Sequence, residues 1–404
     1  MSKITNFMFR RGTVLGGSLL IAGTSIGAGM LALPVLTGPA GFRAAILIYF
    51  ICWAFMVATG LLFLEVSLSL KKDNNIISMS SATLGPIAKA IVWVLYIFLF
   101  YTLNVAYISG SKDFLGSFFP TQYGHILAPI IFVGFFGSLV FIGTYLVDKV
   151  NSILMIGLII SYILFFIFGV RYINIEYLMR SDWSKSMLVL PIAFASFGYQ
   201  GTIPTLITYL DRDVKKIRRS IIIGASIPFL IYVIWEFLIL GIIPFEGEHG
   251  LKGALDMQHS AIPLLKHALN NDYIYLVGLS FAFCSLVSSF LGVSLGVRDF
   301  LADGLKIEKS SLSGRLSLIA LIFLPPLIIA LLKPHIFLTS LNLGGGIGCA
   351  LLLGLLPILM VWSLRYKKRW KSPYRFPGGK ITLTIMAIFV TLEVSFEIIK
   401  LIGG

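Results

Sequence analysis

The apolar run over residues 13–36 is interrupted at its centre by residues 23–29, which read Gly-Thr-Ser-Ile-Gly-Ala-Gly. Glycine weakens a helix interior, so three glycines in seven residues predict a break rather than a continuous span. In a membrane, irregular backbone is tolerated only where protein or a water-filled cavity satisfies the freed N–H and C=O groups. The sequence therefore predicts two half-helices that face a polar site at membrane depth.

A second apolar run, residues 188–210, is interrupted in the same way. Residues 196–201 read Ser-Phe-Gly-Tyr-Gln-Gly and are soon followed by Pro204. Broken helices whose ends meet near the bilayer midplane hold substrates and coupling ions in many secondary transporters. Two such breaks predict a carrier of small molecules.

The composition is that of a membrane protein with many spans. The chain has 404 residues, of which 57% are hydrophobic and only 12% charged, and its mean hydropathy is +0.93. A soluble domain needs a more polar surface than this, and a membrane span needs about 20 mostly apolar residues. We expect one all-α transmembrane domain over residues 1–404 with about 11 helices, at residues 13–36, 44–70, 87–119, 126–147, 150–170, 188–210, 220–243, 273–300, 314–332, 336–364 and 381–401.

The net charge of +14 comes from Lys and Arg residues whose distribution along the chain indicates membrane topology rather than a nucleic-acid-binding surface. Lys and Arg gather before the first span and after the second, fourth, sixth, eighth and tenth. The positive-inside rule places these connections in the cytoplasm. We therefore expect a multi-pass protein of the cell (inner) membrane, with the amino terminus cytoplasmic and the carboxyl terminus outside. The basic run 365–375 is also suited to contact with the lipid bilayer through anionic headgroups.

The two breaks divide the spans into two groups of five. The first group covers about residues 13–170 and the second about residues 188–364, and the helix at about 381–401 is additional. Because five is odd, the second group must enter the membrane from the opposite side, which predicts an inverted repeat. The long connection 244–272 is expected to form either a helical hairpin over an outer vestibule or a solvated loop.

Three stretches together resemble the hydroxy/aromatic amino acid permease family, specifically its tyrosine/tryptophan-specific permeases. They are residues 22–34, residues 196–204 and, as the most specific, residues 289–305 (SFLGVSLGVRDFLADGL). The resemblance covers essentially the whole chain. It implies the LeuT-type 5+5 inverted repeat of the amino acid–polyamine–organocation superfamily, with helices 1 and 6 broken, and proton-coupled import of aromatic amino acids.

The substrate that the resemblance implies is tyrosine above all, with tryptophan and phenylalanine, taken up by proton symport with alternating access. A serine/threonine permease, a sodium-coupled carrier and an amino acid exchanger of the same superfamily stay open as alternatives. An enzyme is not expected, because no acid–base pair, nucleophile–base dyad or metal-ligand motif falls at membrane depth. No cofactor is expected either, and the three cysteines fall in separate spans as packing residues.

The first break can bind both charged groups of an amino acid, the carboxylate and the ammonium. A buried carboxylate needs N–H donors and a buried ammonium needs acceptors, because an unpaired charge in a low-dielectric cavity is very costly. Donors are expected at the start of the outer half-helix and free carbonyls at the end of the inner one. The residues of this break that we predict to bind substrate are Gly23, Thr24, Ser25, Gly27, Ala28 and Gly29. The alternative is that these glycines only allow close helix packing.

The second break and the third span are expected to complete the site. The residues predicted to contact substrate there are Ala195, Ser196, Phe197, Tyr199, Gln200, Asn104 and Tyr107. Carbonyls near Ser196 would share the ammonium, while Asn104 and Tyr107 lie broadly on one helical face. Members of the family commonly have a histidine in the place of Gln200. A proton role of that histidine does not transfer to Gln200, because an amide cannot titrate.

Two coupling ions are compatible with the sequence. All five histidines map to outer connections or their edges, so a histidine relay is excluded on this topology. A carboxyl group inside a span is a functional candidate by default, and we expect the proton to be carried by Glu65 or, second, by Glu236; a structural hydrogen bond is the alternative role of Glu65. Sodium is the rival ion because oxygen ligands suit a hard cation. Its candidate ligands are Ser285, Ser288 and Ser289, opposite the first break.

Overall fold

The computed structural model describes residues 12–70, 74–116 and 119–403. Within these ranges the regular elements are helices and no strand occurs, which confirms the all-α class. Nine helices are long and apolar enough to cross a membrane, and α2 (Val14–Ser25) with α3 (Gly29–Thr37), bent by 59° at a short break, makes a tenth span. The chain is therefore built as a multi-span helical bundle.

The long helices follow most of the predicted windows. They are α4 (Phe42–Ser69), α6 (Pro86–Gly110), which is continued by α7 (Lys112–Leu115), α8 (Thr121–Ile142), α9 (Thr144–Gly169), which is continued by η2 (Val170–Tyr172), α13 (Val214–Ile242), α16 (Asp272–Leu305) and α17 (Leu312–Leu332). Two further spans are composite. One consists of η3 (Trp183–Val189), α11 (Leu190–Ser196), η4 (Gln200–Thr202) and α12 (Ile203–Tyr209); the other consists of α18 (Phe337–Leu343), the π-helix η5 (Gly344–Leu355), α19 (Leu356–Trp362) and η6 (Ser363–Lys367).

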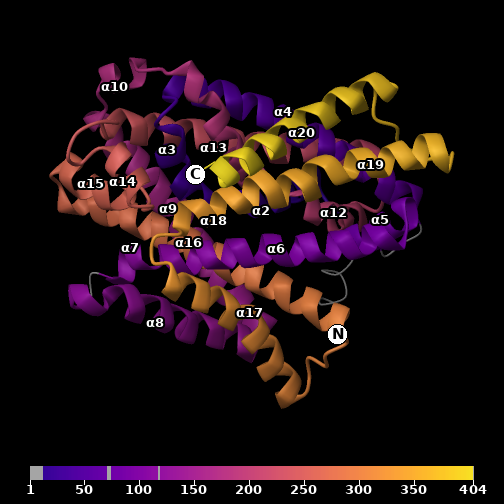
Figure 1. The fold of residues 1–404 in the computed structure, drawn as a ribbon, viewed down its shortest axis with the longest axis horizontal. Helices are drawn as coiled ribbons and strands as arrows, with labels where there is room; N and C mark the ends of the chain where they lie inside the picture. Colours follow the sequence, from indigo (N-terminus) through magenta and orange to yellow (C-terminus); the bar gives the residue numbers. More distant parts are fainter. Residues whose placement is uncertain (1–11, 71–73, 117–118, 404) are drawn as a thin grey trace.

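The short helices mark two ends of the bundle. In Figure 1, α10 (Ile175–Met179), α14 (Leu251–Asp256) and α15 (Ile262–Leu269) gather at the left end of the long helices, and α5 (Ile76–Leu84) and α12 lie at the right. We call the first the cap end. The second is the basic end, because the basic segment 365–380 follows η6 there. The connection 244–272 thus forms two helices, α14 and α15, rather than a solvated loop.

Close helix pairs bring the two groups of spans together. Helix α13 lies along α2, α16 lies along α9, and η5 packs on α6, α11 and α20 (Gly379–Gly403). Glycine permits the tightest of these contacts, because a Cβ on Gly345 of η5 would lie 1.9 Å from the carbonyl oxygen of Pro191 in α11. The second broken helix is therefore held directly against the π-helix.

Two boundaries differ from the sequence prediction. The turn expected at residues 148–149 lies instead at Gly143, whose φ of 141° suits glycine and few other residues, so Asp148 and Lys149 fall inside α9. At the other end of the chain, residues 381–401 form α20 as a helix, but this helix is not among the ten apolar spans. It carries Lys380, Glu393, Glu397 and Lys400.

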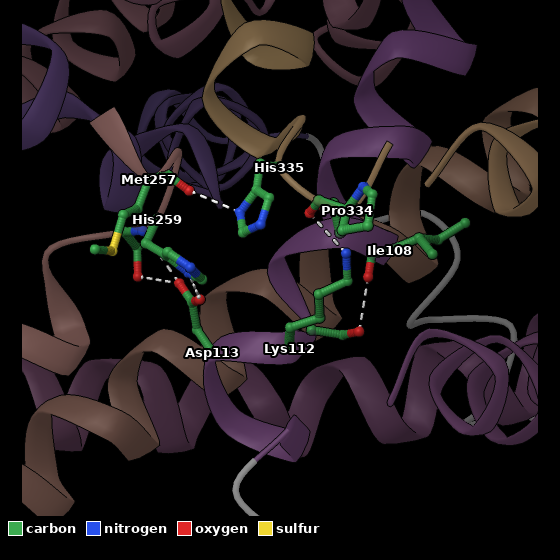
Figure 2. A network of polar contacts seen from close by, with 10 residues as sticks. Ile108, Lys112, Asp113, Met257, His259, Pro334 and His335 are labelled. Carbon is green, nitrogen blue, oxygen red and sulfur yellow. Dashed lines mark hydrogen bonds and ion pairs between the residues drawn. The ribbon is translucent and has the colours of Figure 1, made fainter. Parts of the chain in front are cut away.

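A polar network at the cap end ties three connections together (Figure 2). Asp113 of α7 lies beside His259, with 2.7 Å between Asp113 Oδ1 and His259 Nδ1. The backbone N–H and the hydroxyl of Ser260 donate to the other carboxylate oxygen at 3.1 and 2.6 Å. Lys112 Nζ donates to the Pro334 carbonyl at 2.7 Å. The third span, the α14–α15 hairpin and the start of the tenth span thus share one set of contacts.

The His259 contact predicts a pH-dependent cap. The hydrogen bond with Asp113 raises the pKa of His259. Because the folded pKa lies above the ordinary value of about 6.5, this stabilisation is complete below that pH and is lost as the pH rises through the folded pKa. His259→Gln should remove this component of the pH dependence, which melting curves of detergent-purified protein between about pH 5 and 8.5 measure.

The control for this experiment is His249→Gln, since His249 stacks on His267 with ring centroids 4.1 Å apart. That variant should keep the component. An H259Q protein whose melting temperature follows the wild-type pH profile would contradict the prediction.

Candidate functional site

The first break has the position that the sequence predicts. Helix α2 ends at Ser25 and α3 begins at Gly29, with the 59° bend between them. Inside the break, the N–H of Ala28 donates to the hydroxyl oxygen of Ser289 on α16 at 2.9 Å. The Tyr107 hydroxyl of α6 also interacts with Ser289. The break therefore meets α16 through a polar contact at Ser289, which in turn interacts with α6.

Three glycines of the break have different surroundings. A Cβ on Gly27 would lie 2.4 Å from Ser289 Oγ, and one on Gly29 would lie 2.9 Å from Ser196 Oγ, so both residues permit the close approach of a hydroxyl. A Cβ on Gly23 would have no neighbour within 4 Å in the described part of the chain. Close helix packing, the alternative role of these glycines, is compatible with the contacts of Gly27 and Gly29. Among the described residues, Gly23 adjoins open space.

The second break is also present. Helix α11 ends at Ser196, and residues 197–199 are not helical before η4 and α12 begin. The ring of Phe197 lies 5.2 Å from that of Tyr232 and 6.2 Å from that of Tyr49, measured between centroids. An aromatic wall thus follows directly after the end of α11.

A single hydroxyl joins the two breaks. The Tyr232 oxygen on α13 lies 2.6 Å from the carbonyl oxygen of Ser25 and 2.9 Å from that of Ser196. These residues end α2 and α11, so the partially negative ends of two half-helices converge on this point. A hydroxyl has one proton to donate. The pair of carbonyl oxygens therefore keeps acceptor capacity that suits a cation.

Buried polar atoms without a hydrogen-bond partner occur on the helices that meet here. Among the described residues they include Ser196 Oγ of α11, Ser285 Oγ of α16 and Asn104 Nδ2 of α6. The other amide atom, Asn104 Oδ1, is 3.4 Å from the hydroxyl of Ser294. Buried polar groups in folded proteins are nearly always paired. Of these atoms, Ser196 Oγ lies at the end of α11, where a polar ligand would satisfy it.

The side chains of Tyr199 and Gln200 lie against α4 rather than beside the two carbonyls. Tyr199 donates its hydroxyl proton to the Met56 carbonyl at 3.0 Å, and Gln200 Nε2 lies 2.9 Å from Thr59 Oγ1. The Gln200 side chain also turns back, since its Oε1 accepts from the Tyr199 N–H at 2.9 Å. These residues anchor the second break on α4.

Other predicted side chains are also directed elsewhere. Ser288 donates to Asn151 Oδ1 of α9 at 2.6 Å, so it does not join Ser289 at the first break. The Thr24 hydroxyl donates to the Leu20 carbonyl of its own helix at 2.8 Å. Ala195 packs against η5 at Gly345. The predicted residues that the structure does bring together are Ser25, Gly27, Ala28, Gly29, Tyr107, Ser196, Phe197 and Ser289.

Glu236 lies one helical turn after Tyr232, on the same face of α13. Its side chain is fully buried and accepts hydrogen bonds from the hydroxyls of Thr37, at the end of α3, and Tyr49 of α4, the second at 3.0 Å. Both partners are neutral. The carboxyl group is thus connected through a hydroxyl to α3, the second half of the first broken helix, a contact that no sequence pattern predicts.

Glu65 has a different environment, at the basic end of the bundle. Its carboxylate accepts from Nε and Nη2 of Arg365 at 2.6 and 2.5 Å and from the Phe376 backbone N–H at 2.8 Å. The side chains of Glu65 and Arg365 are only 2% and 4% exposed. The hydroxyl of Ser372 donates to the Glu65 carbonyl at 2.8 Å. Glu65 therefore fastens the segment after η6 to the end of α4.

This ion pair predicts a large stability effect. Glu65→Gln leaves the Arg365 guanidinium buried without a counter-charge, and breaking one side of a buried pair typically costs about 3–5 kcal/mol. We expect E65Q to lower the melting temperature of the purified protein markedly. The double variant E65Q/R365Q should recover part of the loss, because it removes the orphaned charge. Lys368→Gln is the control, at an exposed neighbour whose Nζ donates to the Ala82 carbonyl and lies over the Trp370 ring. A wild-type melting temperature for E65Q would refute this role.

Interrupted spans whose ends meet at a buried polar cluster define a class of proteins, the multi-pass membrane transporters. The family comparison agrees: residues 10–396 match the tryptophan/tyrosine permease family. The chain belongs to that family, as the three motifs indicate. Its members are transport proteins and not enzymes.

Individual relatives are similar over nearly their whole length. The chain is 31% identical to tyrosine-specific transport system 1 of Haemophilus influenzae, over 94% of this chain and 95% of the relative. It is 30% identical to the tryptophan-specific transport protein of Pseudomonas aeruginosa, over 94% and 93%. It is 31% identical to tyrosine-specific transport system 2 of Haemophilus influenzae, over 92% of each chain.

Proposed function

We propose that this permease imports aromatic amino acids, tyrosine foremost and tryptophan and phenylalanine as well, by proton symport with alternating access. The observation that carries the proposal is the convergence of the Ser25 and Ser196 carbonyl oxygens on Tyr232. The names of the relatives support the substrate class, since they are tyrosine-specific and tryptophan-specific transport proteins.

The two breaks offer one site for each charged group of an amino acid. The ammonium group suits the two carbonyl oxygens, because helix C-terminal ends favour positive charge. The carboxylate suits the start of α3, where it would replace Ser289 as the acceptor of the Ala28 N–H. The ring of Phe197 lies immediately beyond the ammonium position and supplies an apolar, aromatic neighbour for the substrate side chain.

The proposed architecture is the LeuT-type 5+5 inverted repeat in one transmembrane domain. It is supported by the position of the breaks, which open two groups of five spans, from α2 to α9 and from α11 to η6. The positive-inside rule places the basic end in the cytoplasm and the cap end outside. If α20 crosses the membrane as the additional helix, the carboxyl terminus is outside.

Glu236 is the carboxyl group that we propose to carry the coupled proton, in preference to Glu65. Glu65 is committed to Arg365, whereas Glu236 is bound by hydroxyls that can donate to a carboxylate or accept from a carboxylic acid. Glu236 also contacts α3, a helix that must move if the first break opens and closes. Sodium coupling has one observation in its favour, the unpaired Ser285 hydroxyl on the same helix as Ser289.

Competition for uptake tests the substrate class. In cells that lack their own aromatic amino acid uptake and express this chain, unlabelled tyrosine should displace labelled tyrosine best. Tryptophan and phenylalanine should follow, and serine should compete poorly, because it has no ring to pack against Phe197. If serine were the strongest competitor, the serine/threonine alternative would replace our proposal.

Replacement of Glu236 tests the coupling. In proteoliposomes, Glu236→Gln should keep tyrosine counterflow exchange but lose accumulation driven by an inward pH gradient, because the amide retains a hydrogen-bonding oxygen and cannot titrate. Tyr49→Phe removes one hydrogen bond and keeps the carboxyl group, so it should still accumulate substrate. Accumulation by E236Q in a pH gradient would exclude Glu236, and accumulation in a sodium gradient alone would establish the rival ion.

A further inference from the structure

The most specific motif of the sequence lies mainly outside the transport site. Its second half, residues 297–305, forms the last turns of α16 at the basic end. Arg298 reaches the turn between α8 and α9, where Nη1 donates to the Val140 carbonyl at 3.1 Å and Nη2 to Thr144 Oγ1 at 2.7 Å. Its Nε is buried and has no partner among the described residues. Arg298 is thus fixed in place while its buried Nε–H donor stays unused.

A cavity of about 190 Å³ opens at this point. It is enclosed by the turn between α8 and α9, by Arg298, by Lys309 in the following connection and by the first turns of α17, which contribute Arg315, Leu318 and Ile319. Three cationic side chains therefore line one small space, together with two apolar residues of α17, Leu318 and Ile319. No carboxyl group of the described chain lines it.

The nearby carboxylates do not cancel these charges inside the cavity. Asp299 pairs with Lys309 Nζ at 3.0 Å and with Arg298 Nη2 at 3.7 Å, and Asp303 pairs with Lys309 Nζ at 3.8 Å. The side chains of Asp299 and Asp303 are 54% and 81% exposed and lie outside the lining. The Arg315 Nε donates to the Lys309 carbonyl at 3.1 Å, which fixes the guanidinium and leaves its terminal N–H groups for another acceptor. Asp299 thus offsets part of the charge of Arg298 and Lys309 from outside the cavity, and no acidic side chain of the described residues lies in its lining.

We propose that this cavity binds a phosphate group, supplied either by the headgroup of an anionic phospholipid or by free phosphate. Arginine forks match the tetrahedral oxygens of phosphate, and lysine adds a point charge. The cavity lies at ends of α8, α9, α16 and α17, which is level with the membrane surface in the proposed topology, and Leu318 and Ile319 suit the first carbons of an acyl chain. A bound phosphate would link α16 to the turn between α8 and α9. Helix α16 also carries Ser289, which contacts the first break.

The site is tested on the full-length protein in a neutral detergent, by melting temperature and by native mass spectrometry. Dioctanoylphosphatidylglycerol and inorganic phosphate are titrated separately, with dioctanoylglycerol as a lipid that has the same chains and no phosphate. We expect the phosphate-bearing ligand to raise the melting temperature and dioctanoylglycerol to have no effect. Protection by phosphatidylglycerol alone identifies a lipid headgroup, and equal protection by inorganic phosphate identifies the free ion.

Variants locate the binding. Lys309→Gln and Arg315→Gln each remove a lining charge, and each should weaken the apparent affinity about tenfold, the usual worth of a charged hydrogen bond. Lys306→Gln removes the same charge from an exposed position in the same connection and should bind as the wild type does. Arg315→Lys, which keeps the charge but not the fork, gives a second comparison if R315Q does not fold.

Three results would overturn the proposal. These are no shift of the wild-type melting temperature with either phosphate-bearing ligand, an equal shift with dioctanoylglycerol, and an equal loss of affinity in K306Q and the lining variants. None of these results bears on amino acid transport, so the outcome of this test is independent of the outcome of the uptake experiments.

Discussion

The meeting of two helix ends at the Tyr232 hydroxyl is the contact on which the centre of this permease depends. Two carbonyl ends carry partial charges of the same sign, and inside a membrane domain neither can turn to water. Tyr232 offers them one shared proton from a third helix, α13. The geometry of both breaks relative to α13 follows from this, since moving either half-helix away would leave a carbonyl unsatisfied. In the proposed transport cycle the substrate ammonium donates to these two carbonyl oxygens, and the Tyr232 hydroxyl donates to them when no substrate is bound.

Helix α13 connects this centre to the buried carboxyl group. Tyr232 and Glu236 lie on one face of the helix a turn apart, and the Glu236 carboxyl group binds Thr37 of α3 and Tyr49 of α4. Helix α3 is thus in contact with the carboxyl group at its C-terminal end and with the hydroxyl of Ser289 at its N-terminal end. A change of protonation at one end and the arrival of a substrate at the other would act on the same short helix, which is a physical basis for coupling.

The parts of this structure that local backbone chemistry determines were predictable, and the parts that distant contacts determine were not. Glycine clusters placed both breaks correctly, because glycine disfavours a helix interior. The cluster Gly344–Gly346 shows that packing can override this preference, since it stays helical within η5. The charged residues Asp148 and Lys149 suggested that the turn between the fourth and fifth spans lies at residues 148–149. The turn lies at Gly143 instead, where the backbone has a positive φ. Tyr232 is one of 16 tyrosines, and nothing in its neighbours sets it apart. The environment of Glu65 depends on Arg365, which lies far along the chain. The residues next to Glu65 in the sequence suggested a proton carrier and gave no sign of the ion pair.

The separation of Glu65 and Arg365 also has a consequence for biosynthesis. The two residues are 300 positions apart, and ribosomes add roughly 5–20 residues per second, so the carboxylate waits about 15–60 s for its partner. During that time α4 holds an acidic group whose counter-charge does not yet exist, and α4 can be fully seated only when the tenth span arrives. A chain that stops before Arg365 would retain this exposed defect, a feature by which membrane proteases could distinguish unfinished from finished molecules.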